Sequence, residues 1–146
     1  MKLETLFTVK ENKLFKIADN SQVDTNTLQR IEIPWSTVEM EDEIYNEEFL
    51  ALLRDQLKHM ETLNNFAVLV PIADKPVSSP EQQEAFINAF NHTARRVKDC
   101  TSVAGFEIIP ELHNPQDFID TLAVKHPQYV YFSKAENPSL KEIVKY

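Results

Sequence analysis

Three carboxyl side chains lie in or directly after apolar runs, where a folded chain could use them for acid–base chemistry. Glu107 lies within the apolar run 103–109, Glu111 follows that run, and Asp74 follows the apolar run 66–72. Because side chains alternate across a strand, we expect Glu107 and Glu111 on one face of it. A carboxyl group held there can act as a general acid or base. Glu111 is the first catalytic candidate, with Asp74 or Glu107 as its partner.

Two further side chains could contact a ligand at the carboxyl ends of the predicted strands. The ring of Trp35 could stack on the apolar face of a sugar, although a core position that closes one end of the sheet is the simpler interpretation. His113 could move a proton, or it could simply hydrogen-bond the backbone or solvent of its loop. The other histidines, His59, His92 and His126, have no clustered partner in the sequence, so no metal site is predicted.

The composition excludes several classes of function. Of 146 residues, 42% are hydrophobic and 26% are charged, as in ordinary globular proteins. The single glycine, Gly105, is too few for loops that cradle nucleotide phosphates, and no cofactor is predicted. A net charge of -8 opposes binding to nucleic acids and to anionic membranes. Cys100 is the only cysteine, so neither an internal disulfide nor a Cys-based zinc site can form.

The hydropathy of the chain bears on its location. The first residues lack the apolar stretch of a signal peptide, and no run is long enough to cross a bilayer. The chain as given is therefore predicted to be cytoplasmic, although removal of a signal peptide would leave the same sequence.

Alternating sequence patterns predict the elements that would position these side chains. Residues 6–9 and 14–17 are β-prone around a polar turn and predict an N-terminal β-hairpin. Apolar runs then alternate with helical stripes, which implies βαβ units, a mainly parallel sheet and one α/β domain over residues 1–146. The predicted strands are 31–35, 66–72, 103–109 and 129–132, and the predicted helices are 46–63 and those that begin at Pro80, Asn114 and Asn137.

Two motifs resemble the cellulase-type family five glycoside hydrolases, which are eight-stranded βα barrels. Residues 90–99 and 103–111 read FNHTARRVKD and VAGFEIIPE, and the family has an aromatic residue, an alanine and Lys-Asp before a strand close to Phe-Glu-Leu-x-Asn-Glu-Pro. By this resemblance, Glu111 falls on the general acid/base and Glu107 on an earlier family glutamate. Residues 31–35, IEIPW, are similar to the family's second strand, Val-Arg-Ile-Pro.

The chain departs from the family at several positions. Glu32 stands where the family has arginine, and the Asp-x-His expected near 71–73 is absent. Pro110 and Leu112 flank Glu111 where the family has asparagine and proline. The predicted strands also end before the seventh, which carries the family's nucleophile. The resemblance implies half of a TIM-like barrel more strongly than it implies an activity.

The favoured hypothesis is a non-catalytic partial barrel kept as a binding or assembly module, with carbohydrate as its expected ligand. Four to five strands cannot close a barrel that needs about eight, so the hairpin, a helix or a second copy in a homodimer must cover the open sheet. The first alternative is a weakly active glycoside hydrolase, which would need a second carboxyl group about 5–5.5 Å from Glu111. The second is a flavodoxin-like open sheet of unknown function.

Overall fold

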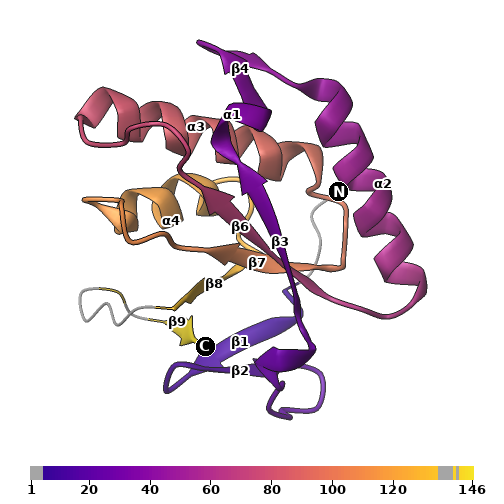
Figure 1. Cartoon of the computed structure of the whole chain (residues 1–146). Helices are drawn as coiled ribbons and strands as arrows, with labels where there is room; N and C mark the ends of the chain where they lie inside the picture. Colours follow the sequence, from indigo (N-terminus) through magenta and orange to yellow (C-terminus); the bar gives the residue numbers. More distant parts are fainter. Residues whose placement is uncertain (1–4, 135–139, 141) are drawn as a thin grey trace.

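A five-stranded parallel sheet forms the centre of the molecule (Figure 1). The computed structural model describes residues 5–134, 140 and 142–146. The strands lie in the spatial order β3, β6, β7, β8, β9, and each pairs in parallel with the next. Spatial order therefore equals chain order, as in a βα barrel, whereas a doubly wound sheet reverses its order at a switch point. The strands are β3 (Gln29–Pro34), β6 (Ala67–Ile72), β7 (Val103–Glu107), β8 (Val130–Ser133) and β9 (Ile143–Lys145).

The helices of the described residues all cover one face of this sheet. Right-handed crossovers between strands that are added in one direction place every connecting helix on the same side. Buried side chains of all four helices share one core with one face of the sheet, so a flavodoxin-like fold, with helices on both faces, does not fit. These helices are α1 (Trp35–Val38), α2 (Glu47–Thr62), α3 (Pro80–Arg96) and α4 (Pro115–Ala123).

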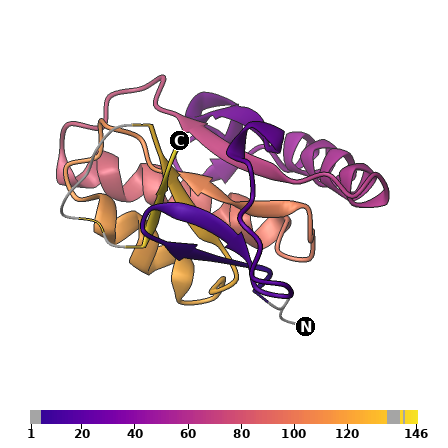
Figure 2. The same cartoon turned by 90° about the horizontal axis from the view of Figure 1, so that it is seen from below.

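The N-terminal hairpin covers the opposite face of the sheet (Figure 2). Its strands, β1 (Phe7–Lys10) and β2 (Lys13–Lys16), pair antiparallel, as the sequence predicts. Glu11 and Asn12 form the turn with φ of 52° and 63°, the left-handed conformation that two-residue hairpin turns need. The hairpin and the sheet enclose a second core, made of Phe7, Leu14, Leu28, Val68, Val70, Ala104, Val130, Phe132 and Val144.

Local capping explains why α2 and α3 begin where the sequence predicts. Asn46 Oδ1 accepts a hydrogen bond of 3.1 Å from the Phe49 N–H at the start of α2. At the start of α3, Ser79 and Gln82 each bond the other's backbone in a capping box, and Pro80 takes the first helical position. A 3-10 turn (Thr25–Thr27) and a small hairpin of β4 (Glu39–Glu41) and β5 (Ile44–Tyr45) complete the elements. No helix in the described part of the chain is long and apolar enough to span a membrane.

Two predicted elements differ from the structure. The strand expected over 103–109 ends at Glu107, because Ile108 and Ile109 both turn into the helix-side core instead of alternating between the two faces. A terminal helix from Asn137 is wrong for residues 143–145, which form β9, and the start of that helix lies outside the described residues. Ile143 faces the helix core and Val144 faces the hairpin core, so both side chains are buried only in a strand.

The β9 edge of the sheet is closed by the hairpin turn. Asn12 Nδ2 donates to the Ile143 carbonyl at 2.8 Å, and the Asn12 carbonyl accepts from the Lys145 N–H at 3.0 Å. These are backbone groups that point away from β8. The turn therefore occupies the position at which another strand would pair.

The β3 edge carries no such cover among the residues that the structure describes. The Gln29 N–H donates to the Phe66 carbonyl, so alternate residues of β3 direct their backbone groups toward β6. Arg30 and Glu32 lie between them and direct their N–H and C=O groups outward. The sheet thus has one closed and one open edge.

Candidate functional site

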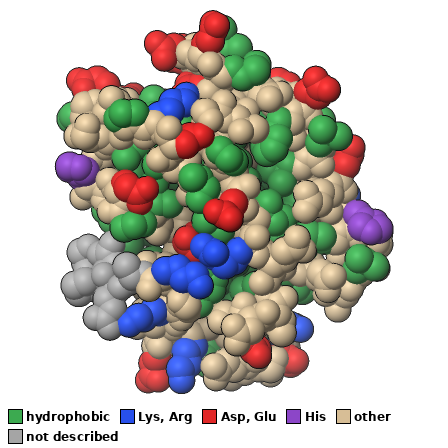
Figure 3. Space-filling view, in the orientation of Figure 1, with side chains coloured by type: hydrophobic (Ala, Val, Ile, Leu, Met, Phe, Trp, Pro, Cys, Tyr) green, Lys and Arg blue, Asp and Glu red, His purple; other side chains and the backbone are tan. Residues whose placement is uncertain are grey.

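Glu107 lies at the carboxyl end of β7, on the hairpin face of the sheet, and is held by two partners. Arg30 Nη2 is 2.9 Å from Glu107 Oε1 and 3.1 Å from Oε2, and Arg30 Nε is 3.2 Å from Oε1. The Tyr146 hydroxyl donates to the same carboxylate. The Glu107 side chain is only 9% exposed and that of Arg30 is 38% exposed. Figure 3 shows basic and acidic side chains meeting near the middle of this face.

The three groups join β3, β7 and Tyr146, the residue that follows β9. Hydrogen bonding to Tyr146 and Glu107 raises the pKa of Arg30, although burial opposes it. Burial and the bond to Glu107 raise the pKa of Tyr146, so its hydroxyl stays protonated and donates. A carboxylate that accepts this many charge-assisted bonds is a structural tie rather than a free acid or base.

Replacing Arg30 with methionine should destabilise the fold by about 2 kcal/mol, because Glu107 would keep a buried charge with only Tyr146 as partner. Urea unfolding followed by circular dichroism measures the loss. The double variant Arg30→Met, Glu107→Gln should recover part of it, since it removes both charges. Equal stability of the single variant and the unchanged protein would refute this role.

Asp74 lies after β6 and is tied to the start of α1. It accepts a hydrogen bond from the Ser36 N–H at 3.0 Å and another from the Ser36 hydroxyl. Burial raises the pKa of the Asp74 carboxyl, but the two bonds from Ser36 outweigh burial and the net pKa lies below its usual value. Asp74 therefore connects the ends of β6 and β3.

Glu111 and His113 do not join the other candidates. Glu111 is exposed in the turn after β7, while Ile108 and Ile109 are both buried in the helix-side core. The expectation that Glu107 and Glu111 share one strand face is therefore wrong. The His113 side chain is exposed, and its backbone N–H donates to Gln83 Oε1 of α3 at 3.2 Å.

Trp35 is buried, with 4% of its surface exposed. Its indole Nε1 donates to Glu39 Oε1 at 2.9 Å, and its ring meets Phe86 edge-on at 5.4 Å. Lys75 Nζ lies over the ring, 4.7 Å from its centroid, and donates to the Glu39 carbonyl at 3.0 Å. A sugar could stack on this ring only if Lys75 moved away.

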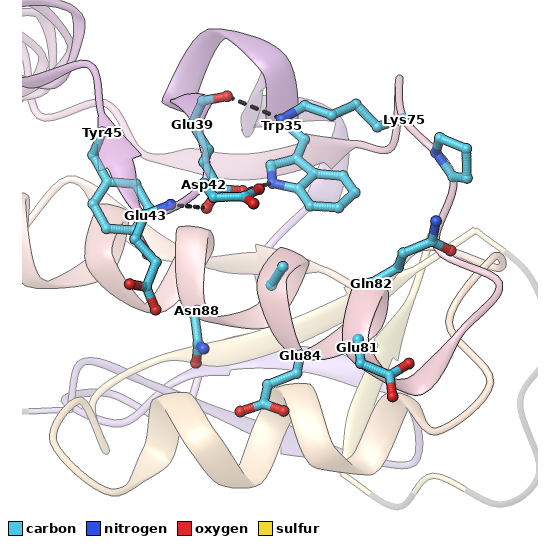
Figure 4. A pocket seen from close by; sticks show the side chains of 12 residues that line it. Trp35, Glu39, Asp42, Glu43, Tyr45, Lys75, Glu81, Gln82, Glu84 and Asn88 are labelled. Carbon is cyan, nitrogen blue, oxygen red and sulfur yellow. Dashed lines mark hydrogen bonds between the residues drawn. The ribbon is translucent and has the colours of Figure 1, made fainter.

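A recess of about 640 Å³ opens beside Trp35, between the β4–β5 hairpin and α3 (Figure 4). Five of its lining residues are acidic and one, Lys75, is basic, so we call it the acidic recess. Glu39, which lines the recess, is buried and uses its second oxygen to accept from the Glu43 N–H at 2.9 Å. In the sequence, the signal for this recess is the acidic stretch 39–48. None of the candidate site residues predicted from the sequence belongs to it. The lining of the recess is Trp35, Glu39, Asp42, Glu43, Tyr45, Lys75, Pro76, Glu81, Gln82, Glu84, Ala85 and Asn88.

The structure thus distributes the candidate residues instead of gathering them. Glu107 bonds Arg30, Asp74 bonds Ser36, and Glu111 stands apart from both. Within the described ranges, no group of three or more His, Cys, Asp or Glu side chains could hold a metal ion. The sequence does not identify Tyr146 and Arg30 as partners of Glu107, because both lie far from Glu107 along the chain.

Comparison with known proteins indicates the fold. No protein-family model matches the chain, and no curated protein matches it in sequence. A family 39 glycoside hydrolase from the gut symbiont Bacteroides cellulosilyticus WH2 has a TM-score of 0.58 and 14% identity, over 73% of this chain and 26% of that one. A GH5_18 protein from Bifidobacterium longum subsp. infantis has a TM-score of 0.53 and 8% identity, over 71% of this chain and 33% of its own. The chain has a glycoside-hydrolase-like α/β fold and spans between a quarter and a third of these neighbours.

Proposed function

We propose that this chain is a non-catalytic relative of glycoside hydrolases, in which part of the barrel serves as a binding or assembly module. The observation that carries this proposal is the engagement of Glu107 by Arg30 and Tyr146. Glycoside hydrolysis uses two carboxyl groups that flank the scissile bond, about 5–5.5 Å or 6.5–9.5 Å apart. Here one carboxylate is neutralised by an arginine, and Glu111 lies outside the strand.

The position of the N-terminal hairpin supports the same proposal. In a closed barrel, the face of the sheet opposite the helices lines the interior. In this chain Phe7 and Leu14 of the hairpin are buried against Val68, Val70 and Phe132 on that face. The hairpin thus stabilises a partial barrel by covering apolar surface that the interior of a closed barrel would bury.

Assays with aryl glycosides and short β-glucans test the absence of catalysis. We expect no hydrolysis above background by the unchanged protein, by Glu111→Gln or by Glu107→Gln. The last variant should lower stability because it weakens the tie to Arg30. Hydrolysis that Glu111→Gln abolishes without loss of stability would overturn the proposal in favour of an enzyme with Glu111 as general acid/base.

The acidic recess is the place at which a carbohydrate would bind this module. Its aromatic wall, carboxylates and the amides of Gln82 and Asn88 are the groups that bind sugar rings and hydroxyls. Lys75 would have to leave the Trp35 ring, so we expect weak binding with a change in the environment of the indole.

The open β3 edge supports assembly as a homodimer. Closing two copies into one barrel would require β3 of each copy to pair with β9 of the other, and Asn12 occupies the β9 edge. Antiparallel pairing of β3 with β3 of a second copy meets no such obstacle. It would continue the sheet across a twofold axis rather than close a barrel.

Charge favours one register for that pairing. With the twofold axis at Ile31, Arg30 of each copy faces Glu32 of the other, and their outward N–H and C=O groups can exchange four backbone hydrogen bonds. An axis at Arg30 or at Glu32 would place like charges opposite each other, which destabilises a strand pair. Pro34, which has no N–H, limits the ladder at one end.

Sedimentation equilibrium of Glu32→Pro tests the dimer. Proline should remove one outward N–H per copy without disturbing the bonds to β6, so we expect a monomer where the unchanged protein is a dimer. Glu32→Lys should weaken the dimer through repulsion with Arg30, whereas Glu41→Lys, the same charge change on β4, should not. If the unchanged protein remains a monomer over a 100-fold range of concentration, this assembly is contradicted. The non-catalytic assignment would still stand.

A further inference from the structure

A second recess, on the helix side of the molecule, has the opposite charge to the acidic recess. It lies between the carboxyl half of α3 and the segment that follows α4, with a volume of about 730 Å³. Arg95, Lys98 and Lys125 line it, and no carboxylate does. We call it the basic recess. Such a concentration of positive charge is notable in a chain with a net charge of -8.

The three basic side chains form no ion pair within 4.0 Å in the part of the chain that the structure describes. The ion pairs of the described residues involve Arg30, Arg54, Lys58, His92 and Arg96. Glu47 Oε1 is 2.9 Å from His92 Nε2 and 3.7 Å from Arg96 Nε, and the Glu47 carboxylate also interacts electrostatically with Arg95. The positive charge of the basic recess is therefore available to a ligand.

His126 supplies an independent indication of a ligand. It lines the recess, is only 4% exposed, and its ring Nδ1 is buried without a hydrogen-bond partner. Its backbone N–H donates to the Leu122 carbonyl at 2.9 Å, so the end of α4 fixes its position. Buried polar atoms of native proteins nearly always have a partner. This unpaired nitrogen has no exposed surface, so a group from outside the chain would reach it only after the ring or its neighbours move.

Asn91 adds a second unpaired atom at the same place. Its Oδ1 is buried without a partner and the residue also lines the basic recess. An asparagine amide can present either its oxygen or its two N–H donors to a site, because its two orientations have the same shape. Rotation of this amide by half a turn would place donors at the buried position that the oxygen now holds, where an anion could meet them only after neighbouring side chains move.

The end of α3 offers a simpler explanation for some of the charge, since basic residues stabilise the negative end of a helix. That effect accounts for Arg95 and Lys98. Lys125 stands in the same position at the carboxyl end of α4, whereas the unpaired nitrogen of His126 has no such explanation. Burial, with Lys98 and Lys125 nearby, lowers the pKa of His126, so a neutral ring can donate one N–H without adding charge.

We propose that the basic recess binds a small organic phosphate, with Arg95, Lys98 and Lys125 around the phosphate group and His126 and Asn91 donating to its oxygens. A phosphate monoester carries about two negative charges and several strong acceptor oxygens, which matches three cations and two neutral donors. The volume suits an organic ester better than inorganic phosphate, because ligand pockets of about 300–1,000 Å³ hold small metabolites. This site is separate from the β3 edge and the acidic recess.

Isothermal titration of the full chain with glucose 6-phosphate, inorganic phosphate and glucose tests the proposal. We expect glucose 6-phosphate to bind more tightly than inorganic phosphate, and glucose not to bind here. Arg95→Gln and Lys125→Gln should each weaken glucose 6-phosphate about tenfold, because each removes one charge-assisted contact. Lys16→Gln, the same loss of charge on the hairpin, is the control and should leave the affinity unchanged.

His126→Phe separates a binding role from a structural one. The phenyl ring keeps the bulk of the imidazole but has no polar atom, so this variant should lose most phosphate affinity while its melting temperature without ligand stays the same or rises. A lower melting temperature with unchanged affinity would overturn the assignment. So would the absence of binding by glucose 6-phosphate and inorganic phosphate at millimolar concentration, or affinities that Arg95→Gln and Lys125→Gln leave unaltered. None of these outcomes bears on glycoside hydrolysis or on the dimer.

Discussion

Replacing Gly105 with alanine should prevent the sheet from forming. A Cβ atom at this position would lie 1.5 Å from the Val130 carbonyl oxygen and 2.6 Å from its carbonyl carbon, both in the backbone of β8. No side-chain rotation relieves a contact with backbone, so β7 and β8 would have to separate. We expect insoluble protein, or soluble protein without a cooperative thermal transition in circular dichroism.

Ala104→Gly is the matched control for this prediction. Ala104 is the neighbouring buried residue of β7 and packs in the hairpin core. Its loss of a methyl group and its gain of backbone freedom should cost about 1–2 kcal/mol and leave the transition cooperative. If Gly105→Ala melts at the temperature of the unchanged protein, the close approach of β7 to β8 is refuted, and with it the central pairing of the sheet.

The strongly patterned elements of this fold can be predicted from the sequence. α2 and α3 have apolar stripes together with recognisable caps at Asn46 and Ser79, and β6 is apolar throughout because both its faces are covered. For α2 and α3, residue propensity, apolar periodicity and capping all favour the same helix.

The carboxyl-terminal strand could not be predicted because its local signals favour a helix. Asn137-Pro138 resembles a helix start, and Ile143 and Val144 fit either an apolar stripe or a strand. This segment forms a strand because β8 pairs with it in parallel, and because Ile143 and Val144 are buried in the two cores on opposite faces of the sheet. Tertiary contacts therefore decide this element.

The environment of Glu107 illustrates the same limit for the candidate site. A buried strand glutamate predicts a counter-charge, but Arg30 and Tyr146 are 77 and 39 residues away in the sequence. Arg30 is two positions before Glu32, the position of the family's arginine, and the two side chains share a strand face. The resemblance located the glutamate, and only the folded sheet identifies the group that neutralises it.

Replacing Trp35 with alanine should cost about 3–5 kcal/mol of folding free energy, as expected for an aromatic side chain deleted from a core. The indole packs on Phe86 and Lys75, and its loss would also leave Glu39 Oε1 buried without its donor. Chemical unfolding followed by far-ultraviolet circular dichroism measures the difference. Trp35→Phe should retain the packing and lose about 1–3 kcal/mol for the unpaired Glu39 oxygen.

Trp35 is the only tryptophan, so its fluorescence can distinguish a core residue from a platform for sugars. A buried indole should emit at short wavelength and shift to longer wavelength only on unfolding. Stacking of an oligosaccharide would displace Lys75 and shift the emission of the folded protein, and Lys75→Met should then alter the apparent affinity. If Trp35→Ala remains as stable as the unchanged protein, the indole does not support the fold. If sugars leave the emission unchanged, carbohydrate does not stack on Trp35 in the acidic recess, and this residue acts by packing alone.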